Sequence, residues 1–201
     1  MKKIILSLGL LAGISGAAHA QSIKYGVKAG ASLTSLTGSD SDGTKNKFGF
    51  NGGVLANFGI NDMFSIQPEV LYSNKGYKFD GGQNGLRLAL NYIDVPVLVK
   101  IATGSTGLFF ELGPQVGFRL AADVKDDDNS ASIKDYTKGV DFGYAGGLGY
   151  QIESGPMIGL RYNGGFTKIG KDGSISGIPV TAANAKNSAF QLYIGYMFGG
   201  K

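Results

Sequence analysis

The most regular pattern in the chain is an alternation of apolar residues with small or polar ones. Near the C-terminus, Phe190, Leu192, Ile194, Tyr196 and Phe198 fall on one face, and Ala189, Gln191, Tyr193, Gly195 and Met197 on the other. Because successive side chains of a β-strand point to opposite faces, this period of two predicts a strand. Eight stretches show the pattern, at about residues 24–34, 48–60, 63–74, 93–101, 108–122, 139–152, 157–166 and 189–198.

In these stretches one face carries large apolar residues, and the other carries small residues and nearly every charge. The charges on the small face are Lys28, Glu69, Lys75, Asp94, Lys100, Glu111, Arg119, Asp141 and Arg161. A soluble β-sandwich would show the opposite arrangement, with bulky residues packed inward and charges outward. Lipid outside and a narrow lumen filled by side chains would produce the observed one. The sequence therefore predicts an all-β protein, an eight-stranded antiparallel up-and-down transmembrane β-barrel over residues 21–201.

The connections between the stretches alternate in length. Short ones lie at 61–62, 103–107 and 153–155, and long polar ones near 35–47, 75–87, 123–138 and 167–187. Short periplasmic turns and long extracellular loops are typical of outer membrane barrels. A soluble lipocalin-like barrel is the alternative architecture.

The N-terminal segment has the three parts of an export signal. Lys2 and Lys3 precede an apolar run from Ile4 to Ala18, which leads to Ala18-His19-Ala20 and then Gln21. This order predicts a signal peptide over residues 1–20. A membrane-anchoring helix is the competing interpretation, but the run is shorter than the roughly 20 residues needed to span a bilayer. We expect export to the outer membrane of a Gram-negative bacterium.

Two local features depart from regular alternation. Between Arg87 and Tyr92 the apolar residues fall on the opposite parity, which predicts a bulge or a strand end. Pro68, Pro96 and Pro114 lie inside predicted strands, where each removes a hydrogen-bond donor from the ladder. We expect bulges or kinks at the prolines.

Composition limits the chemistry that the protein can perform. Removing residues 1–20 leaves 17 Lys and Arg against 15 Asp and Glu, so the net charge falls from +4 to +2. Without a concentrated basic stripe, nucleic acid is not an expected partner. The chain has no Cys, and its single histidine, His19, leaves with the signal peptide. This excludes Ser-His-Asp and Cys-His catalysis, thiol redox chemistry, His-ligated haem and zinc sites of His or Cys.

Two remaining candidates for chemistry are weak. Asp126-Asp127-Asp128-Asn129 lacks the alternating ligand spacing of a calcium loop, and acidic runs are usually solvated. The glycines between Gly143 and Gly149 alternate along a predicted strand and open no helix, as a phosphate loop would. Glu69 and Asp94 could form a carboxylate pair, but a filled lumen would admit no substrate. We expect no enzyme, no cofactor and no metal site.

Several segments resemble a known family. They are residues 67–76 (QPEVLYSNKG) followed by 92–100 (YIDVPVLVK), and later 113–117 (GPQVG), 141–143 (DFG), 146–149 (GGLG) and 161–163 (RYN). In this order the motifs resemble the PorT-type outer-membrane β-barrel-domain family. The resemblance implies a small Gram-negative outer membrane barrel. Some relatives are tied to protein secretion and gliding machinery, but such a role does not transfer on barrel motifs alone.

The inward charges allow two interpretations, a structural salt-bridge network that fills the lumen or a polar conduit for small solutes. The interior of an eight-stranded barrel is just wide enough for side chains to fill, and five cations against four carboxylates are nearly balanced. We therefore expect a structural or interaction barrel that acts through its extracellular loops, for example as an envelope or secretion-machinery accessory. The alternative is a narrow porin-like channel or transport accessory. The expected partners are outer membrane lipid, lipopolysaccharide, the barrel-assembly machinery and an unidentified envelope protein.

Overall fold

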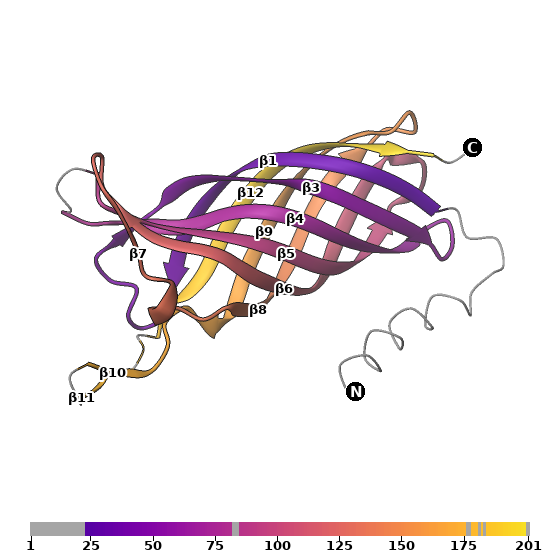
Figure 1. Cartoon of the computed structure of the whole chain (residues 1–201). Helices are drawn as coiled ribbons and strands as arrows, with labels where there is room; N and C mark the ends of the chain where they lie inside the picture. Colours follow the sequence, from indigo (N-terminus) through magenta and orange to yellow (C-terminus); the bar gives the residue numbers. More distant parts are fainter. Residues whose placement is uncertain (1–22, 82–84, 176–177, 181, 183, 200–201) are drawn as a thin grey trace.

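The computed structural model describes residues 23–81, 85–175, 178–180, 182 and 184–199, and its long strands close into an antiparallel barrel (Figure 1). The barrel strands are β1 (Ile23–Thr37), β3 (Lys47–Gly59), β4 (Phe64–Phe79), β5 (Arg87–Ala102), β6 (Leu108–Lys125), β8 (Val140–Gln151), β9 (Pro156–Lys168) and β12 (Lys186–Phe198). Each pairs with its neighbours in the chain, and β1 pairs with β12. The predicted eight-stranded up-and-down barrel is confirmed. Closure leaves no free edge, so the backbone can be satisfied within lipid.

The predicted signal peptide lies outside the described residues. Within the described part of the chain, no helix is both long enough and apolar enough to cross a bilayer.

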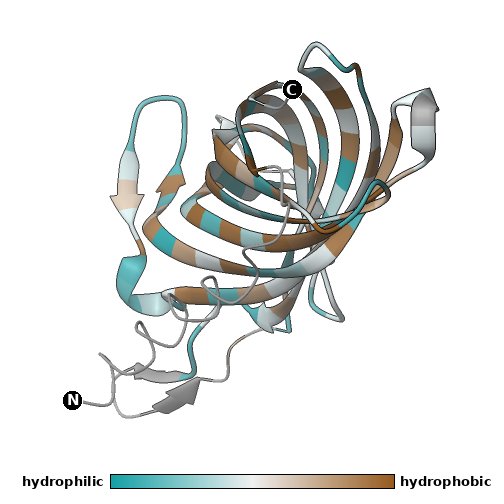
Figure 2. Cartoon of the chain, turned by 90° about the vertical axis from the view of Figure 1, so that its right-hand side faces the viewer, coloured by the Kyte–Doolittle hydropathy of each residue, from teal (hydrophilic) through white to brown (hydrophobic). Residues whose placement is uncertain are grey.

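The two faces of the strands have the polarity that the alternation predicted, and the bands of hydropathy around the wall can be followed in Figure 2. On β12, Phe190 and Ile194 are 63% and 64% exposed, whereas Gln191 and Tyr193 are 3% and 1% exposed. The outer surface is therefore a continuous apolar wall, and the buried interior is largely polar. A soluble lipocalin-like barrel would place that apolar wall in water, so this alternative is wrong.

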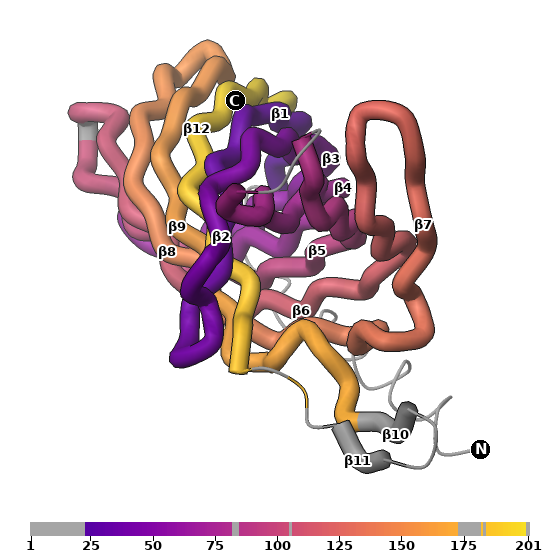
Figure 3. The backbone as a smooth tube through the Cα atoms, turned by 90° about the vertical axis from the view of Figure 1, so that its left-hand side faces the viewer, coloured from indigo at the N-terminus to yellow at the C-terminus, as the bar shows by residue number. Residues whose placement is uncertain are grey.

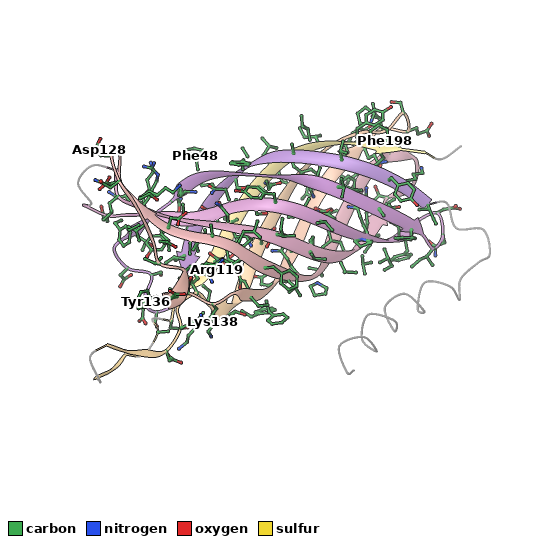
Figure 4. All side chains as sticks on the ribbon, viewed as in Figure 1. Phe48, Arg119, Asp128, Tyr136, Lys138 and Phe198 are labelled. Carbon is green, nitrogen blue, oxygen red and sulfur yellow. The ribbon has the colours of Figure 1, made fainter. Side chains whose placement is uncertain are left out.

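Aromatic side chains gather at both ends of the apolar wall. The outer girdle, at the loop end, consists of Phe48, Phe50, Tyr72, Tyr144, Tyr162, Phe166 and Phe190. The inner girdle, at the end with the short turns, consists of Tyr25, Phe58, Phe64, Phe110, Tyr150, Tyr196 and Phe198. Figure 4 labels one member of each, Phe48 and Phe198, at opposite ends of the barrel. Aromatic girdles mark the two membrane interfaces of outer membrane barrels.

The four long connections lie together at one end, as the alternation of lengths predicted (Figure 3). They contain more strand than expected, because β4, β5 and β6 continue past the predicted strand ends. The short strands β2 (Thr44–Lys45) and β7 (Ser130–Ser132) pair with β4 and β6, and β10 (Gly173–Ile175) pairs with β11 (Ile178–Val180). The loop end is thus partly built from extensions of the barrel wall.

The opposite parity at Arg87–Tyr92 has one cause, the lumen-facing direction of these apolar side chains. A bulge lies beside this segment, since the β5–β6 register shifts between Asn91 and Tyr92, but its extra residue is Leu120 on β6, so it leaves the parity of β5 unchanged. The predicted alternative of a strand end is wrong, since β5 begins at Arg87. Leu88, Leu90 and Tyr92 instead point inward. They form the mouth cluster with Ala122 and Ile169, against which Leu36, Tyr77, Phe79, Val124 and Ile133 pack. The loop end of the lumen is therefore filled with apolar side chains, so in this part of β5 the apolar residues face inward, where the alternation further along the strand places polar ones.

The bulges predicted at the three prolines are wrong, whereas the kinks that were the alternative stay a prediction. The register is the same on both sides of Pro68 and of Pro96, and pairing between β6 and β8 runs without a shift through Pro114. The paired positions are interrupted next to Pro68 and Pro96. Each missing donor therefore opens a local gap in the ladder and inserts no residue.

Candidate functional site

Buried charges from opposite sides of the wall meet in the middle of the lumen. The Arg161 guanidinium on β9 donates to both carboxylate oxygens of Glu69 on β4, at 2.7 and 2.9 Å. Its Nε donates to Glu111 Oε1 on β6 at 2.7 Å, and the Lys28 ammonium lies 3.1 Å from Glu69 Oε2. The Tyr193 hydroxyl donates to Glu111 at 3.1 Å. We call Lys28, Glu69, Glu111, Arg161 and Tyr193 the central cluster.

The central cluster is fully buried and balanced. Its ion-paired side chains have no solvent exposure, and two cations face two carboxylates. The Lys28 ammonium also lies 4.0 Å from the centre of the Tyr193 ring. Buried charges are tolerated when they are paired and hydrogen-bonded, and the fork of an arginine suits two oxygens of one carboxylate. These contacts tie β1, β4, β6, β9 and β12 together across the lumen.

Glycine allows the central cluster to form. Gly147 on β8 is the register partner of Glu111 on one side and of Arg161 on the other. A Cβ at Gly147 would lie 2.4 Å from the Leu160 carbonyl oxygen and 3.1 Å from Glu111 Oε1. The space above this glycine is therefore where the two long side chains meet. The glycines between Gly143 and Gly149 line a strand, which agrees with the interpretation against a phosphate loop.

A second polar layer lies between the central cluster and the mouth cluster. The Lys75 ammonium is 2.9 Å from Asp94 Oδ1 and lies 4.7 Å from the centre of the Tyr92 ring. Asn187 Nδ2 donates to Asp141 Oδ2 at 2.8 Å. Asp94, Gly117 and Asp141 are consecutive partners in the sheet register, so the two carboxylates flank a glycine.

Lys100 lies nearer the periplasmic turns. Its ammonium donates to Gln151 Oε1 at 2.6 Å and sits 3.8 Å from the centre of the Phe109 ring. Eight of the nine charges singled out in the sequence are thus buried in the lumen, at three levels: Lys28, Glu69, Glu111 and Arg161 in the central cluster, Lys75, Asp94 and Asp141 above it, and Lys100 below.

The structure does not bring Arg119 into this network. Its guanidinium donates to the Lys134 carbonyl at 2.8 Å and to the Thr137 hydroxyl, both at the 3-10 helix η3 (Lys134–Tyr136). Figure 4 shows Arg119 close to the labelled Tyr136 and Lys138. Arg119 is on an inward position next to the bulge of β6, and from there it holds the third loop against the barrel.

Sequence reasoning that followed charge alone missed the neutral members of the lumen. Gln67 donates to Glu69 at 2.8 Å, and Asn163 donates to Gln115 at 3.0 Å. Their inward parity was the signal that could have found them. Lys47 was missed because it lies in a segment predicted as a loop, although its ammonium donates to Asn74 and to the Lys75 carbonyl.

The polar layer below the mouth cluster leaves little free space. A cavity of about 10 Å³ lies among Lys75, Gln115, Asp141, Asn163 and Asn187, which is about the size of one water molecule. The oxygens Asp141 Oδ1, Asn163 Oδ1 and Asn187 Oδ1 are buried and have no hydrogen-bond partner in the described part of the chain. One ordered water could serve such acceptors, but a solute would need more room.

The acidic run of the third loop forms a turn. Asp126 Oδ1 accepts the backbone N–H groups of Asn129 and Asp128, which hold the pKa of the Asp126 carboxyl below its usual range. A side chain that bonds to the backbone two and three residues on is an ordinary turn device. Among the residues that the structure describes, no group of three or more His, Cys, Asp or Glu is placed to hold a metal ion.

Two loops that are far apart in the sequence are joined at the outer end. Asp40 Oδ2 accepts the backbone N–H of Asn184 at 2.7 Å, and Asn184 Nδ2 donates to Ser39 at 3.3 Å. The N–H of Asn184 and the Ser39 hydroxyl hold the pKa of the Asp40 carboxyl below its usual range. Because the folded pKa is depressed, this contact stabilises the loops at neutral pH and is lost as the pH falls through that lowered pKa.

We expect the variant Asp40→Ala to release the first loop from the fourth. The amide hydrogen of Asn184 then exchanges with solvent at least about tenfold faster at neutral pH, because its acceptor is gone. Amide exchange followed by NMR on the folded barrel measures this. Asp42→Ala, a similar change in the same loop, is the control. Equal exchange at Asn184 in both variants would contradict the contact.

The closed fold, the outward apolar wall and the paired interior define a small outer membrane β-barrel. A model of the family described as outer membrane protein beta-barrel domain matches residues 19–170, more than half of the chain, and the chain belongs to this family. The protein is therefore an outer membrane barrel of Gram-negative type.

Two solved structures show the same fold at low sequence identity. Neisserial surface protein A, from Neisseria, is 19% identical, with 87% of this chain and 97% of that chain covered and a TM-score of 0.56. Ail, the attachment invasion locus protein of Yersinia pestis, was solved in complex with the heparin analogue sucrose octasulfate. It is 16% identical, with 88% of this chain and 99% of that chain covered and a TM-score of 0.50. A search of curated protein sequences finds no match.

Proposed function

We propose that this protein is a plugged interaction barrel, in which the filled lumen is structural and the extracellular loops bind a partner in the envelope or at the cell surface. On the motifs around Pro68 and Pro96, we further propose that it belongs to the PorT-type branch and serves as an envelope or secretion-machinery accessory. Lipopolysaccharide and the barrel-assembly machinery are its proposed partners in the membrane.

The blocked lumen is the observation that carries the proposal. Three successive layers of buried side chains fill it, namely the central cluster, the layer around Lys75 and Asp94, and the mouth cluster. Each polar layer contains at least one buried ion pair that a passing solute would have to separate. Such pairs resist disruption, since removing one partner of a buried pair costs about 3–5 kcal/mol. A lumen of this kind supports a structural role and disfavours the porin-like alternative.

The loop end supports the interaction part of the proposal. The loops are held in place by contacts with the barrel and with one another, such as the Arg119 contact to η3 and the Asp40 contact to Asn184. Surface loops on a rigid scaffold are where binding residues usually lie. Tyr136, in the third long loop, is 67% exposed at the end of the barrel that we take to be extracellular.

The test is chemical crosslinking in intact cells followed by capture of the tagged protein. The wild type is compared with a barrel whose residues 126–138 are replaced by a short turn, and its folding is checked by the shift in mobility on unheated gels. We expect a distinct crosslinked species with the wild type that the trimmed barrel lacks. The same species with both proteins, or none with either, would contradict a role for the third loop.

A further inference from the structure

The small polar cavity below the mouth cluster is lined by acceptors that lack donors. Asp141 on β8, Asn163 on β9 and Asn187 on β12 contribute side chains that are at least nine-tenths buried. The Oδ1 atom of each has no hydrogen-bond partner in the described part of the chain. We call these three atoms the oxygen site. Buried polar atoms are nearly always satisfied, so three unsatisfied acceptors around one cavity indicate that a further species binds there.

The hydrogen bonds around the oxygen site leave acceptors and no donors. Asn163 Nδ2 donates to Gln115 Oε1 at 3.0 Å, and Asn187 Nδ2 donates to Asp141 Oδ2 at 2.8 Å. Because the nitrogen end of each amide bonds to a neighbouring residue, its oxygen end is left over. Asp141 Oδ1 lies 3.5 Å from the position that a Cβ would take at Gly165, another residue that lines the cavity. The free carboxylate oxygen therefore borders the open space.

The layer around the oxygen site is short of one positive charge. The Lys75 ammonium, which also lines the cavity, lies 2.9 Å from Asp94 Oδ1 and bonds to none of the three site oxygens. Within the described residues, no cationic side chain forms a salt bridge with Asp141. Lys75 thus balances Asp94, and the charge of Asp141 is left over. A buried charge without its partner is strongly destabilising.

Two species are small enough for a cavity of about 10 Å³, namely one water molecule and one monovalent cation without its hydration shell. Water donates only two hydrogens, so a single water leaves at least one of the three site oxygens unsatisfied and adds no charge. A cation attracts the lone pairs of all three oxygens and supplies the missing positive charge. The count of acceptors and the count of charges therefore both favour the cation.

We propose that the oxygen site binds one small monovalent cation of the sodium type. Carboxylate and amide oxygens are the ligands that hard cations prefer in proteins. Calcium takes about six to eight oxygens, whereas this site offers one carboxylate and two amides. The ligands come from β8, β9 and β12, so the cation joins three adjacent strands of the wall. Because the central cluster and the mouth cluster lie on either side, the cation completes the plug and does not pass through it.

The test measures reversible unfolding by urea in phosphatidylcholine vesicles while sodium chloride replaces choline chloride. Total salt is held constant, so the screening of other charges does not change. Choline is too large for the cavity. A ligand that binds only the folded state raises the folding equilibrium constant in proportion to its concentration once the site is filled. We therefore expect this constant to rise by up to about tenfold for each tenfold rise in sodium.

Two variants are expected to abolish the sodium dependence, leaving a change of no more than about twofold. Asp141→Asn removes the charge, and in choline chloride alone it is expected to be more stable than the wild type, because no unpaired charge is buried. Gly165→Ala keeps all three oxygens but places a Cβ 3.0 Å from the Asn187 carbonyl oxygen, within the cavity. The control Asp128→Asn removes an exposed carboxylate of the third loop and is expected to keep the wild-type response.

A wild type that does not respond to sodium would overturn the proposal, since water or a protonated Asp141 would then occupy the oxygen site. The same sodium response in Asp141→Asn and the wild type, or its loss in Asp128→Asn as well, would also overturn it. A parallel titration with calcium chloride tests the charge of the ion. Stabilisation by calcium that sodium does not produce would replace the monovalent cation with a divalent one and contradict the proposal.

Discussion

Replacing Arg161 with alanine is expected to lower the free energy of unfolding by about 3–5 kcal/mol, because it leaves buried carboxylates without their cation. Arg161 makes three of the hydrogen bonds that hold Glu69 and Glu111, and none of these side chains is exposed. Lys28 would remain beside Glu69, so Glu111 would lose the most. Reversible unfolding by urea in phosphatidylcholine vesicles, monitored by a shift in gel mobility, measures the change.

The control for this prediction is Arg87→Ala. Arg87 is a partly exposed arginine 3.6 Å from Asp127, and an exposed pair of this kind contributes at most about 1 kcal/mol. Arg161→Lys is expected to fall between the two, because it keeps the charge and loses the fork. Similar small costs for Arg161→Ala and Arg87→Ala would show that the central cluster does little to hold the barrel together.

Replacing Gly147 with valine is expected to cost about 1–3 kcal/mol or more through overpacking. The added Cβ would lie 2.4 Å from a backbone oxygen of β9, and the rest of the side chain would enter the space used by Glu111 and Arg161. The adjacent glycine provides the control. At Gly146, on the lipid face, the nearest atom to an added Cβ is the flexible end of Leu112 at 3.2 Å.

We expect Gly146→Val to unfold within about 1 kcal/mol of the wild type, because lipid accommodates its side chain and valine favours strands. Both variants are measured in the same urea titration. A cost for Gly146→Val equal to that for Gly147→Val would mean that loss of glycine from β8 matters more than the crowding of the central cluster.

Alternation was sufficient to predict the architecture. The alternation of apolar and small or polar residues shows that a segment is a strand, and it also shows which of its side chains face lipid and which face the lumen. Such two-faced strands are what a closed barrel requires. Leu192 and Gln191 illustrate this, since each lies on the face that its parity predicted. Parity also placed Lys28, Glu69 and Arg161 in one interior, although their mutual contacts required a register that no single strand reveals.

The sequence-based predictions fail where the same kind of residue occurs in two different environments of the barrel. Leu88 and Leu90 looked out of phase because they were assumed to face lipid, whereas they fill the loop end of the lumen. Arg119 has the parity of a lumen residue, but it lies close enough to the rim to donate a hydrogen bond to η3. The effect of a proline was overestimated, because a closed sheet can lose one donor and still keep its register across Pro68.

The central claim is that the lumen is plugged, and electrical recording from planar lipid bilayers tests it most directly. Folded protein is added to the bilayer in concentrated potassium chloride, and its insertion is verified by recovery of the folded form from matching proteoliposomes. A barrel filled by the central cluster and the mouth cluster predicts a flat current trace with no stepwise openings. Reproducible conductance steps that scale with the amount of inserted protein would contradict the account and favour a narrow channel.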